Sequence, residues 1–135
     1  EIAEKVGLPA ECLTRRPNEL SGGQRQALTL LMATIKRPKL LLLDEHTAAL
    51  DPKTAAKVLS LTERIIDRDK LTALMITHNM RDALKYGNRL IMMYNGRILV
   101  DVAGEEKKNL TTQDLLLMFE KAAGNTLDSD RLLLG

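Results

Sequence analysis

The chain has 135 residues, of which 44% are hydrophobic and 28% charged, and this length and balance are typical of one folded domain and exclude a disordered segment. The formal net charge of +2 is too small to indicate a nucleic-acid partner, and one Phe, two Tyr and no Trp give no platform for stacking bases. A single cysteine, Cys12, excludes an internal disulfide, and no apolar run approaches the roughly 20 residues of a membrane-spanning helix.

The first part of the chain is predicted to be helical, with one break. Residues 1–13 have the pattern of a short amphipathic helix, and residues 15–18 have that of a loop. Ser21 is a favourable helix N-cap, and Gln24 follows it at the spacing of a capping box. Apolar residues then recur at helical spacing, which predicts a helix from Ser21 to Ile35.

Two short apolar stretches follow, separated by a helical pattern. Leu40–Leu43 is an unbroken apolar run, which predicts a strand buried on both faces, as in a parallel sheet covered by helices. A proline at its first position and apolar residues at helical spacing predict a helix over 52–68. Residues 71–77 are predicted to form a second strand, and a cap residue predicts a helix over 79–86.

The last part of the chain begins with a predicted β-hairpin. An Asn-Gly pair, the strongest short hairpin signal, lies between residues 89–94 and 97–102. A final helix is predicted from residue 111 or 112 to 123, closed by Gly124 and followed by a tail at 125–135. The order strand, helix, strand, helix and hairpin predicts an α/β fold.

Two acidic residues, Asp44 and Glu45, directly follow the leucine run. Functional groups of open α/β sheets lie at the carboxyl ends of the strands, where adjacent carboxylates are costly unless a cation or a reacting water compensates. Asp44 is therefore a candidate metal ligand, with a structural cap as the alternative, and Glu45 is a candidate base for an attacking water. His78 follows the second predicted strand and is a candidate to reach a terminal phosphate or that water, although such a histidine is more often a hydrogen-bonding residue.

The stretch Ser21-Gly22-Gly23 is a second candidate site. Ser and Gly are ordinary residues at the start of a helix. A Gly-Gly pair there also exposes backbone N–H groups at the positive end of the helix dipole, which suits an anionic phosphate. The spacing alone leaves both interpretations open.

The motifs taken together, in their order and spacing, closely resemble those of the ATP-binding-cassette (ABC) ATPases. They are Leu20-Ser21-Gly22-Gly23-Gln24-Arg25-Gln26, Leu40-Leu41-Leu42-Leu43-Asp44-Glu45, Ala49-Leu50-Asp51-Pro52 and Thr77-His78. The resemblance runs from about Asn18 to about Val102. It implies the partial core of a P-loop NTPase (RecA-like) in residues 1–124, with part of the helical subdomain in 1–37 and part of the catalytic core in 38–124.

By this resemblance, residues 20–24 are the signature segment, residues 40–44 the Walker B strand and residues 49–51 the D-loop segment. The resemblance also implies a role for single residues: Asp44 holds Mg²⁺, Glu45 and His78 are catalytic, and Ser21, Gly22, Gly23, Gln24 and Asp51 contact ATP. In the family two cassettes meet head to tail, so the signature segment serves the nucleotide site of the opposite subunit.

The sequence departs from the family pattern in two places. His46 follows Glu45 where the family usually has proline, and we expect activity to survive this change because the position shapes the turn more than the chemistry. A role of its own for His46 is the alternative. No G-x-x-x-x-G-K-[ST] motif, the P-loop that cradles phosphates, occurs in the 135 residues. The motifs present are therefore those expected in the C-terminal part of a cassette, and we expect the chain alone to have no ATPase activity.

The resemblance implies an ATPase subunit of a bacterial-type transporter that drives import. The expected partners are a second ATPase subunit, transmembrane permease subunits and, for an importer, a substrate-binding protein, at the cytoplasmic face of the membrane. Two alternatives stay open: an ABC ATPase of translation or DNA maintenance, and a non-catalytic module that only supplies the signature segment. No long coiled coil of the DNA-maintenance type is present in the sequence.

Overall fold

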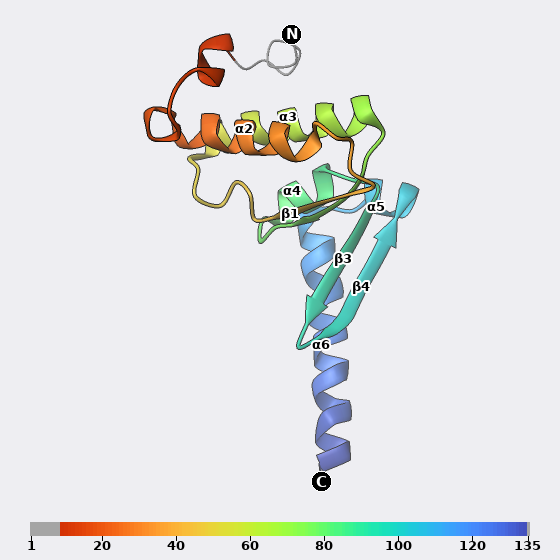
Figure 1. Cartoon of the computed structure of the whole chain (residues 1–135). Coiled ribbons are helices and arrows are strands. Elements are labelled where there is room, and N and C mark those ends of the chain that lie inside the picture. The colour runs from red at the N-terminus through yellow and green to blue at the C-terminus, as the bar shows by residue number, and fades with distance from the viewer. Residues whose placement is uncertain (1–8, 135) are drawn as a thin grey trace. The chain divides into compact units, whose positions relative to one another are not determined.

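The computed structural model describes the backbone of residues 9–134 and the side chains of residues 9–124 (Figure 1). The chain divides into two compact units, Glu1–Thr77 and His78–Gly135. Most of the helix predicted over residues 1–13 lies outside the described residues. Each unit is described below by itself.

The first described turns of the chain are 3₁₀ helices. Ala10–Leu13 forms η1 and Pro17–Glu19 forms η2, so the predicted loop at 15–18 contains a helical turn. The helix α2 then spans Gly22–Thr34, which confirms the predicted helix there. Its N-cap is Ser21, because the side chain of this serine accepts a hydrogen bond from the first turn of the helix, as the sequence predicted.

The sheet of the first unit has two parallel strands. β1 (Leu40–Asp44) pairs with β2 (Thr72–Ile76), so that Leu42 lies beside Leu74 and Asp44 beside Ile76. The helix α3 (Pro52–Asp69) connects the two strands, as in a βαβ unit. The order of these elements agrees with the predicted α/β fold.

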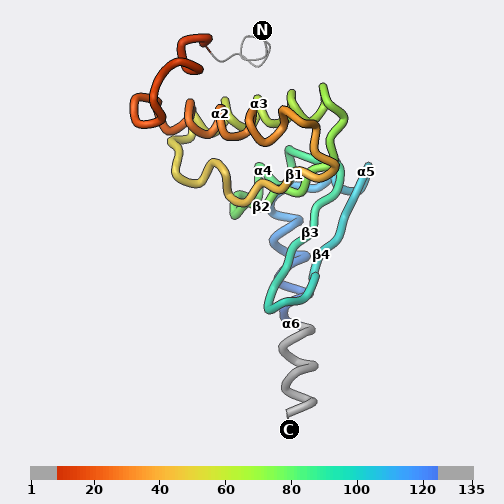
Figure 2. Tube along the Cα trace, in the orientation of Figure 1, coloured from red at the N-terminus to blue at the C-terminus, as the bar shows by residue number. Residues whose placement is uncertain are grey.

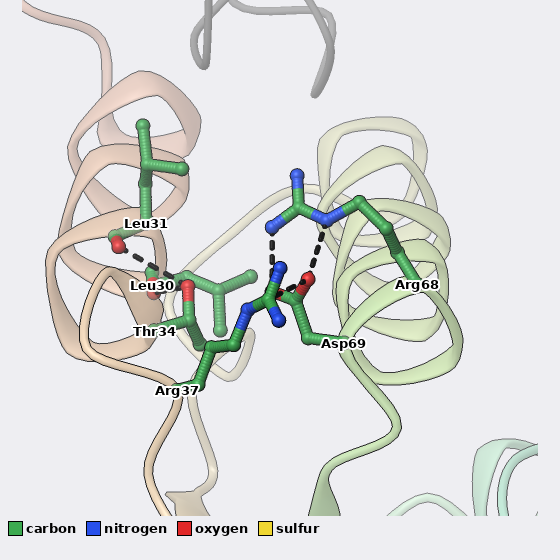
Figure 3. A network of polar contacts seen from close by, with 6 residues as sticks. All are labelled: Leu30, Leu31, Thr34, Arg37, Arg68 and Asp69. Carbon is green, nitrogen blue, oxygen red and sulfur yellow. Dashed lines mark hydrogen bonds and ion pairs between the residues drawn. The ribbon is translucent and has the colours of Figure 1, made fainter.

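Helices α2 and α3 lie side by side over one face of this sheet (Figure 2). The side chains between the helices and the sheet are apolar and buried, and they include Leu30, Leu31, Leu41, Leu43, Leu61 and Ile65. An ion pair links the C-terminal ends of the two helices, with Nε of Arg37 3.9 Å from Oδ1 of Asp69 (Figure 3). Asp69 also accepts two hydrogen bonds from Arg68.

The opposite face of the sheet is open in the described part of the chain. Leu40 and Leu42 of β1 are 52% and 65% exposed, and Leu74 and Ile76 of β2 are 53% and 49% exposed. The prediction that the leucine strand is buried on both faces is therefore wrong for these residues. Side chains alternate between the two faces along a strand, and both helices of the unit cover the same face of the sheet. Of the four leucines of β1, only Leu41 and Leu43 are therefore buried.

The second unit is built on an antiparallel hairpin. β3 (Arg89–Tyr94) pairs with β4 (Arg97–Ala103), and the turn between them has positive φ at both central residues, 47° at Asn95 and 73° at Gly96. These angles confirm the predicted two-residue hairpin. Short helices flank the hairpin, α4 over Met80–Lys85 and α5 over Gly104–Lys108.

The last helix, α6, spans Thr112–Leu134 and packs Leu115 against Leu90, Val100 and Val102 of the hairpin. The prediction that this helix ends before Gly124 is wrong, because the helix continues through Gly124. Glycine weakens a helix by about 1 kcal/mol relative to alanine and does not end it when helix-forming residues follow. Among the described residues, no helix combines the length and the apolar character needed to cross a membrane.

Candidate functional site

The two adjacent acids lie at the carboxyl end of β1, where the sequence placed them. Asp44 is the last residue of the strand, and Glu45 begins the loop that leads to α3. The side chains of both residues are exposed. The backbone N–H of Glu45 donates a hydrogen bond to the carbonyl oxygen of Ile76 at 2.9 Å, so the neighbouring strand β2 holds the start of the loop.

Glu45 has a left-handed backbone conformation, with φ of 48°. This conformation costs a residue other than glycine about 1–2 kcal/mol. Such strain persists only where surrounding contacts enforce it, and it is concentrated at functional sites. A proline at position 46 would restrict the backbone of Glu45 to extended conformations, and His46 imposes no such limit.

His46 is half-buried and is attached to the interior of α3. Its Nε2 lies 3.0 Å from Oγ1 of Thr62, which is 3% exposed. The Thr62 hydroxyl donates its own hydrogen to the carbonyl oxygen of Val58 at 2.8 Å, so we assign Nε2–H of His46 as the donor to Thr62. Burial lowers the pKa of His46, which favours the neutral imidazole.

Asp44 is compatible with Mg²⁺ as a single carboxylate ligand. This ion is typically held by one or two carboxylates, with waters and substrate phosphates completing its coordination. In the described part of the chain, no group of three or more His, Cys, Asp or Glu side chains is placed to hold a metal ion. An Mg²⁺ ion at Asp44 would therefore need ligands besides the described His, Cys, Asp and Glu side chains, such as the nucleotide and water.

The signature segment forms the start of α2. The backbone N–H of Gln24 donates to Oγ of Ser21 at 3.2 Å, and Oε1 of Gln24 accepts from the N–H of Ser21 at 3.0 Å. This reciprocal pair is the predicted capping box. The N–H groups of Gly22 and Gly23 lie at the positive end of the helix, where an anion is favoured, and Gly23 is itself buried in this structure.

The two glycines also pack directly against the D-loop segment and the start of α3. A Cβ atom on Gly22 would lie 3.2 Å from Cδ2 of Leu50, and one on Gly23 would overlap Cγ2 of Thr54. The structure therefore brings the signature segment and the D-loop segment together. Side-chain packing of this closeness is a second physical reason for glycine here, beside the approach of a phosphate.

Asp51 is the N-cap of α3. Its carboxylate accepts a hydrogen bond from the backbone N–H of Thr54 at 3.0 Å. Hydrogen bonds from the side chain and the backbone of Thr54 lower the pKa of Asp51, so the residue is ionised in neutral solution. In the chain as described, Asp51 has a local structural role at the helix start.

His78 is the first residue of the second unit. It is exposed, and it precedes Asn79, whose side chain caps α4 by accepting from the N–H groups of Arg81 and Asp82. The predicted cap at Asn79 is thereby confirmed. A role for His78 at a phosphate or at the attacking water stays a prediction.

Two threonines of α3 that the sequence reasoning did not single out contribute to these sites. Thr54 contacts Gly23, and Thr62 binds His46. Thr62 occupies a position on the buried face of the helix between Val58 and Ile65. A polar residue at an apolar position is a signal that could have identified it, whereas Thr54 offers no such signal.

Comparison with known proteins places these residues in a family. Residues 1–48 match the family model described as ABC transporter. The tyrosine transport ATP-binding protein of Clostridioides difficile (strain R20291) is 54% identical over 103 residues, which are 76% of this chain and 41% of that protein. The phosphonates import ATP-binding protein PhnC 1 of Ruegeria sp. (strain TM1040) is 40% identical over 75% of this chain and 39% of its own length.

Solved structures support the same assignment. The dimeric structure of MJ0796, a bacterial ABC transporter cassette, is 29% identical and has a TM-score of 0.61, over 76% of this chain and 44% of that chain. A second structure of that cassette, in a post-hydrolysis state bound to ADP and Pi, gives the same TM-score of 0.61. The chain spans about two fifths of the length of the curated relatives it matches. These relationships and the α/β fold show an ABC transporter ATPase domain that is homologous to ABC ATP-binding proteins.

Proposed function

We propose that this chain is the catalytic-acid and signature portion of an ATPase that couples ATP binding and hydrolysis to transport across a membrane. The observation that carries the proposal is the arrangement of Asp44 and Glu45 at the carboxyl end of a parallel strand. Glu45 there has a left-handed backbone conformation, and its N–H donates a hydrogen bond to the carbonyl oxygen of Ile76. Relatives that match over three quarters of the chain are named as ATP-binding proteins of transporters.

In the proposed reaction the two acids have different tasks. Asp44 would hold Mg²⁺, and the bound ion would neutralise charge on the phosphates of ATP. Glu45 orients the attacking water and accepts its proton, which requires a solvent-accessible carboxylate such as this exposed side chain. His78 is proposed to donate a hydrogen bond to the terminal phosphate or the water.

The signature segment is proposed to act on a second nucleotide site, in a head-to-tail dimer. The N–H groups of Gly22 and Gly23 would bind the γ-phosphate held by the partner cassette, and Ser21 and Gln24 would contact the same ATP. Asp51 would link the two sites across the dimer. Support comes from the packing of Gly23 on Thr54, which joins the signature segment to the helix that Asp51 caps.

The proposed activity requires a P-loop, and the 135 residues contain no G-x-x-x-x-G-K-[ST] motif. We propose that additional polypeptide supplies it, and that the chain alone hydrolyses no ATP. Transmembrane permease subunits, a substrate-binding protein and a position at the cytoplasmic face of the membrane follow from a role in import. The named substrates of the relatives differ, tyrosine for one and phosphonates for another, so we assign no substrate.

The test compares wild type with Glu45→Gln in the complete ATPase that contains this chain. Removal of the carboxylate should lower kcat by about 10²–10⁴-fold, the contribution of a general base, while ATP still binds and accumulates in the dimer. Glu63→Gln is the matched control, because Glu63 is an exposed glutamate of α3 to which no role in the reaction is assigned. Hydrolysis at the wild-type rate by Glu45→Gln would refute the role of Glu45.

A further inference from the structure

The loop after Glu45 has a second attachment to the first unit, independent of the sheet. At its start, the N–H of Glu45 is bound to the carbonyl oxygen of Ile76. One residue later, the imidazole of His46 reaches Oγ1 of Thr62 at 3.0 Å. Glu45 is therefore flanked by a backbone hydrogen bond to β2 on one side and a side-chain hydrogen bond to α3 on the other.

The attachment to α3 has a fixed direction. Thr62 is a buried residue whose hydroxyl hydrogen is donated to Val58 within the helix, so its oxygen is left to accept. Nε2–H of His46 is the group that satisfies it. Loss of His46 would leave the buried Thr62 oxygen without a donor, and loss of Thr62 would leave the half-buried imidazole without this acceptor.

The part of α3 that accepts the hydrogen bond from His46 is closely packed. On the same face as Thr62, Val58, Leu61 and Ile65 are 4%, 7% and 1% exposed. Side chains in such a close-packed interior occupy single rotamers, so Thr62 offers a stable acceptor. A flexible surface acceptor would not hold the loop.

We propose that His46 is a positioning residue that holds Glu45 in its left-handed conformation through the hydrogen bond to Thr62. Since a left-handed Glu45 costs free energy, neighbouring contacts have to enforce it, and His46 is its next residue in the chain. The consequence for catalysis rests on the function proposed above for Glu45. The structural consequence, an ordered turn at Glu45, does not.

The experiment uses variants that remove or keep the hydrogen bond in the ATPase that contains this chain. His46→Leu and Thr62→Val remove it, whereas His46→Gln places an N–H donor near the position of Nε2 and Thr62→Ser keeps the hydroxyl. Thr34→Val is the matched control. Thr34 is 2% exposed, and its hydroxyl also donates to the carbonyl oxygen four residues earlier, that of Leu30 (Figure 3). Unlike Thr62, Thr34 is not bound to His46.

The first measurement is amide hydrogen exchange at residues 45–48. We expect exchange about tenfold faster in His46→Leu and in Thr62→Val, the change that loss of one hydrogen bond produces, and no further increase in the double variant. His46→Gln and Thr62→Ser should stay near wild type, as should Thr34→Val. Unchanged exchange in both His46→Leu and Thr62→Val, or an equal increase in Thr34→Val, would overturn the proposal.

The second measurement is ATP hydrolysis. We expect kcat to fall about tenfold in His46→Leu and Thr62→Val with KM unchanged, because the misplaced group acts on the water and not on nucleotide binding. His46→Gln should restore most of the rate. If exchange changes as expected but kcat does not, the positioning of the turn by His46 stands and the catalytic role proposed for Glu45 fails.

Discussion

Gly23 at the start of α2 lies against the side chain of Thr54 in the first turn of α3, so closely that a Cβ atom on Gly23 would overlap the Thr54 methyl group. Thr54 also donates its backbone N–H to the cap residue Asp51. The contact therefore joins the start of the signature helix to the end of the D-loop segment. Both segments are proposed to act on the same partner subunit, and this packing places them in direct contact.

Replacement of Gly23 by alanine should strain this contact. Overpacking of this kind destabilises a protein by about 1–3 kcal/mol, and the β-branched Thr54 has little freedom to turn away inside a helix. Thr54→Ser removes the methyl group and should restore most of the lost stability in the double variant. The measurement is amide exchange in α2 and α3, because a chain with two compact units need not unfold in one step.

Gly124 provides the matched control for that substitution. It lies within α6, and an added Cβ there meets no atom within 4 Å. Gly124→Ala should therefore be stabilising by up to about 1 kcal/mol. ATPase activity separates the two reasons for glycine at position 23, which are packing on Thr54 and the approach of a phosphate. If the Gly23→Ala/Thr54→Ser double variant recovers both stability and turnover, packing is the reason. If it recovers stability alone, glycine is needed for the phosphate.

The cap of α3 should depend on pH. The pKa of Asp51 is lowered in the folded chain by hydrogen bonds from the side chain and backbone of Thr54, so the carboxylate contributes stability above the unfolded pKa of about 3.9. That contribution is lost as the pH falls through the folded pKa, which lies lower still. Asp51→Ala should destabilise the start of α3 at pH 7 but have little effect in stronger acid, measured by exchange or circular dichroism.

Asn keeps an acceptor at the same place, so Asp51→Asn should retain much of the cap and show no pH dependence from this position. Equal losses in Asp51→Ala at pH 7 and in strong acid would contradict the assignment of the carboxylate as the cap.

Lys107 should stabilise the second unit although it is charged and buried. The residue is 3% exposed, burial lowers its pKa, and its Nζ donates to the carbonyl oxygens of Tyr86 and Gly87 at 2.6 and 2.7 Å. Lys107→Met should lower the stability of this unit by about 1–3 kcal/mol, because the two carbonyls lose their charged donor. Thermal or denaturant unfolding, followed in the second unit, measures the change.

Lys108 is the neighbouring control, with a side chain that is 70% exposed and an ion pair to Glu105. Lys108→Met should change stability by less than about 1 kcal/mol, as is usual for surface ion pairs. Similar losses for the two lysines would contradict the role of the buried hydrogen bonds.

The open face of the β1–β2 sheet should make the isolated 135-residue chain prone to self-association. Leu42 and Leu74 lie side by side there, each more than half exposed. Exposed apolar patches favour association, and threonine at both positions keeps β propensity while reducing the apolar area. The double threonine variant should stay monomeric at higher concentration in sedimentation or light scattering than wild type. Met32→Thr, at an exposed position of α2, should have a smaller effect.

Local interactions explain why much of this fold could be predicted from the sequence. The capping box of Ser21 and Gln24, the cap at Asn79 and the turn at Asn95 involve residues at most three positions apart, so the residue types fix them. The α/β order and the position of Asp44 and Glu45 after a strand likewise follow from periodicity. By themselves, the residues therefore determined these caps, the hairpin turn and the order of the motifs.

The tertiary structure decided what depends on distant residues. An unbroken leucine run does not reveal that α2 and α3 cover the same face of the sheet, so the exposure of Leu40 and Leu42 could not be foreseen. The contacts of Gly23 with Thr54 and of His46 with Thr62 also require α3 to be in place, because they join residues from different elements. Periodicity reports which side of a segment is apolar, but only the packing of segments decides which apolar sides are covered and which side chains meet.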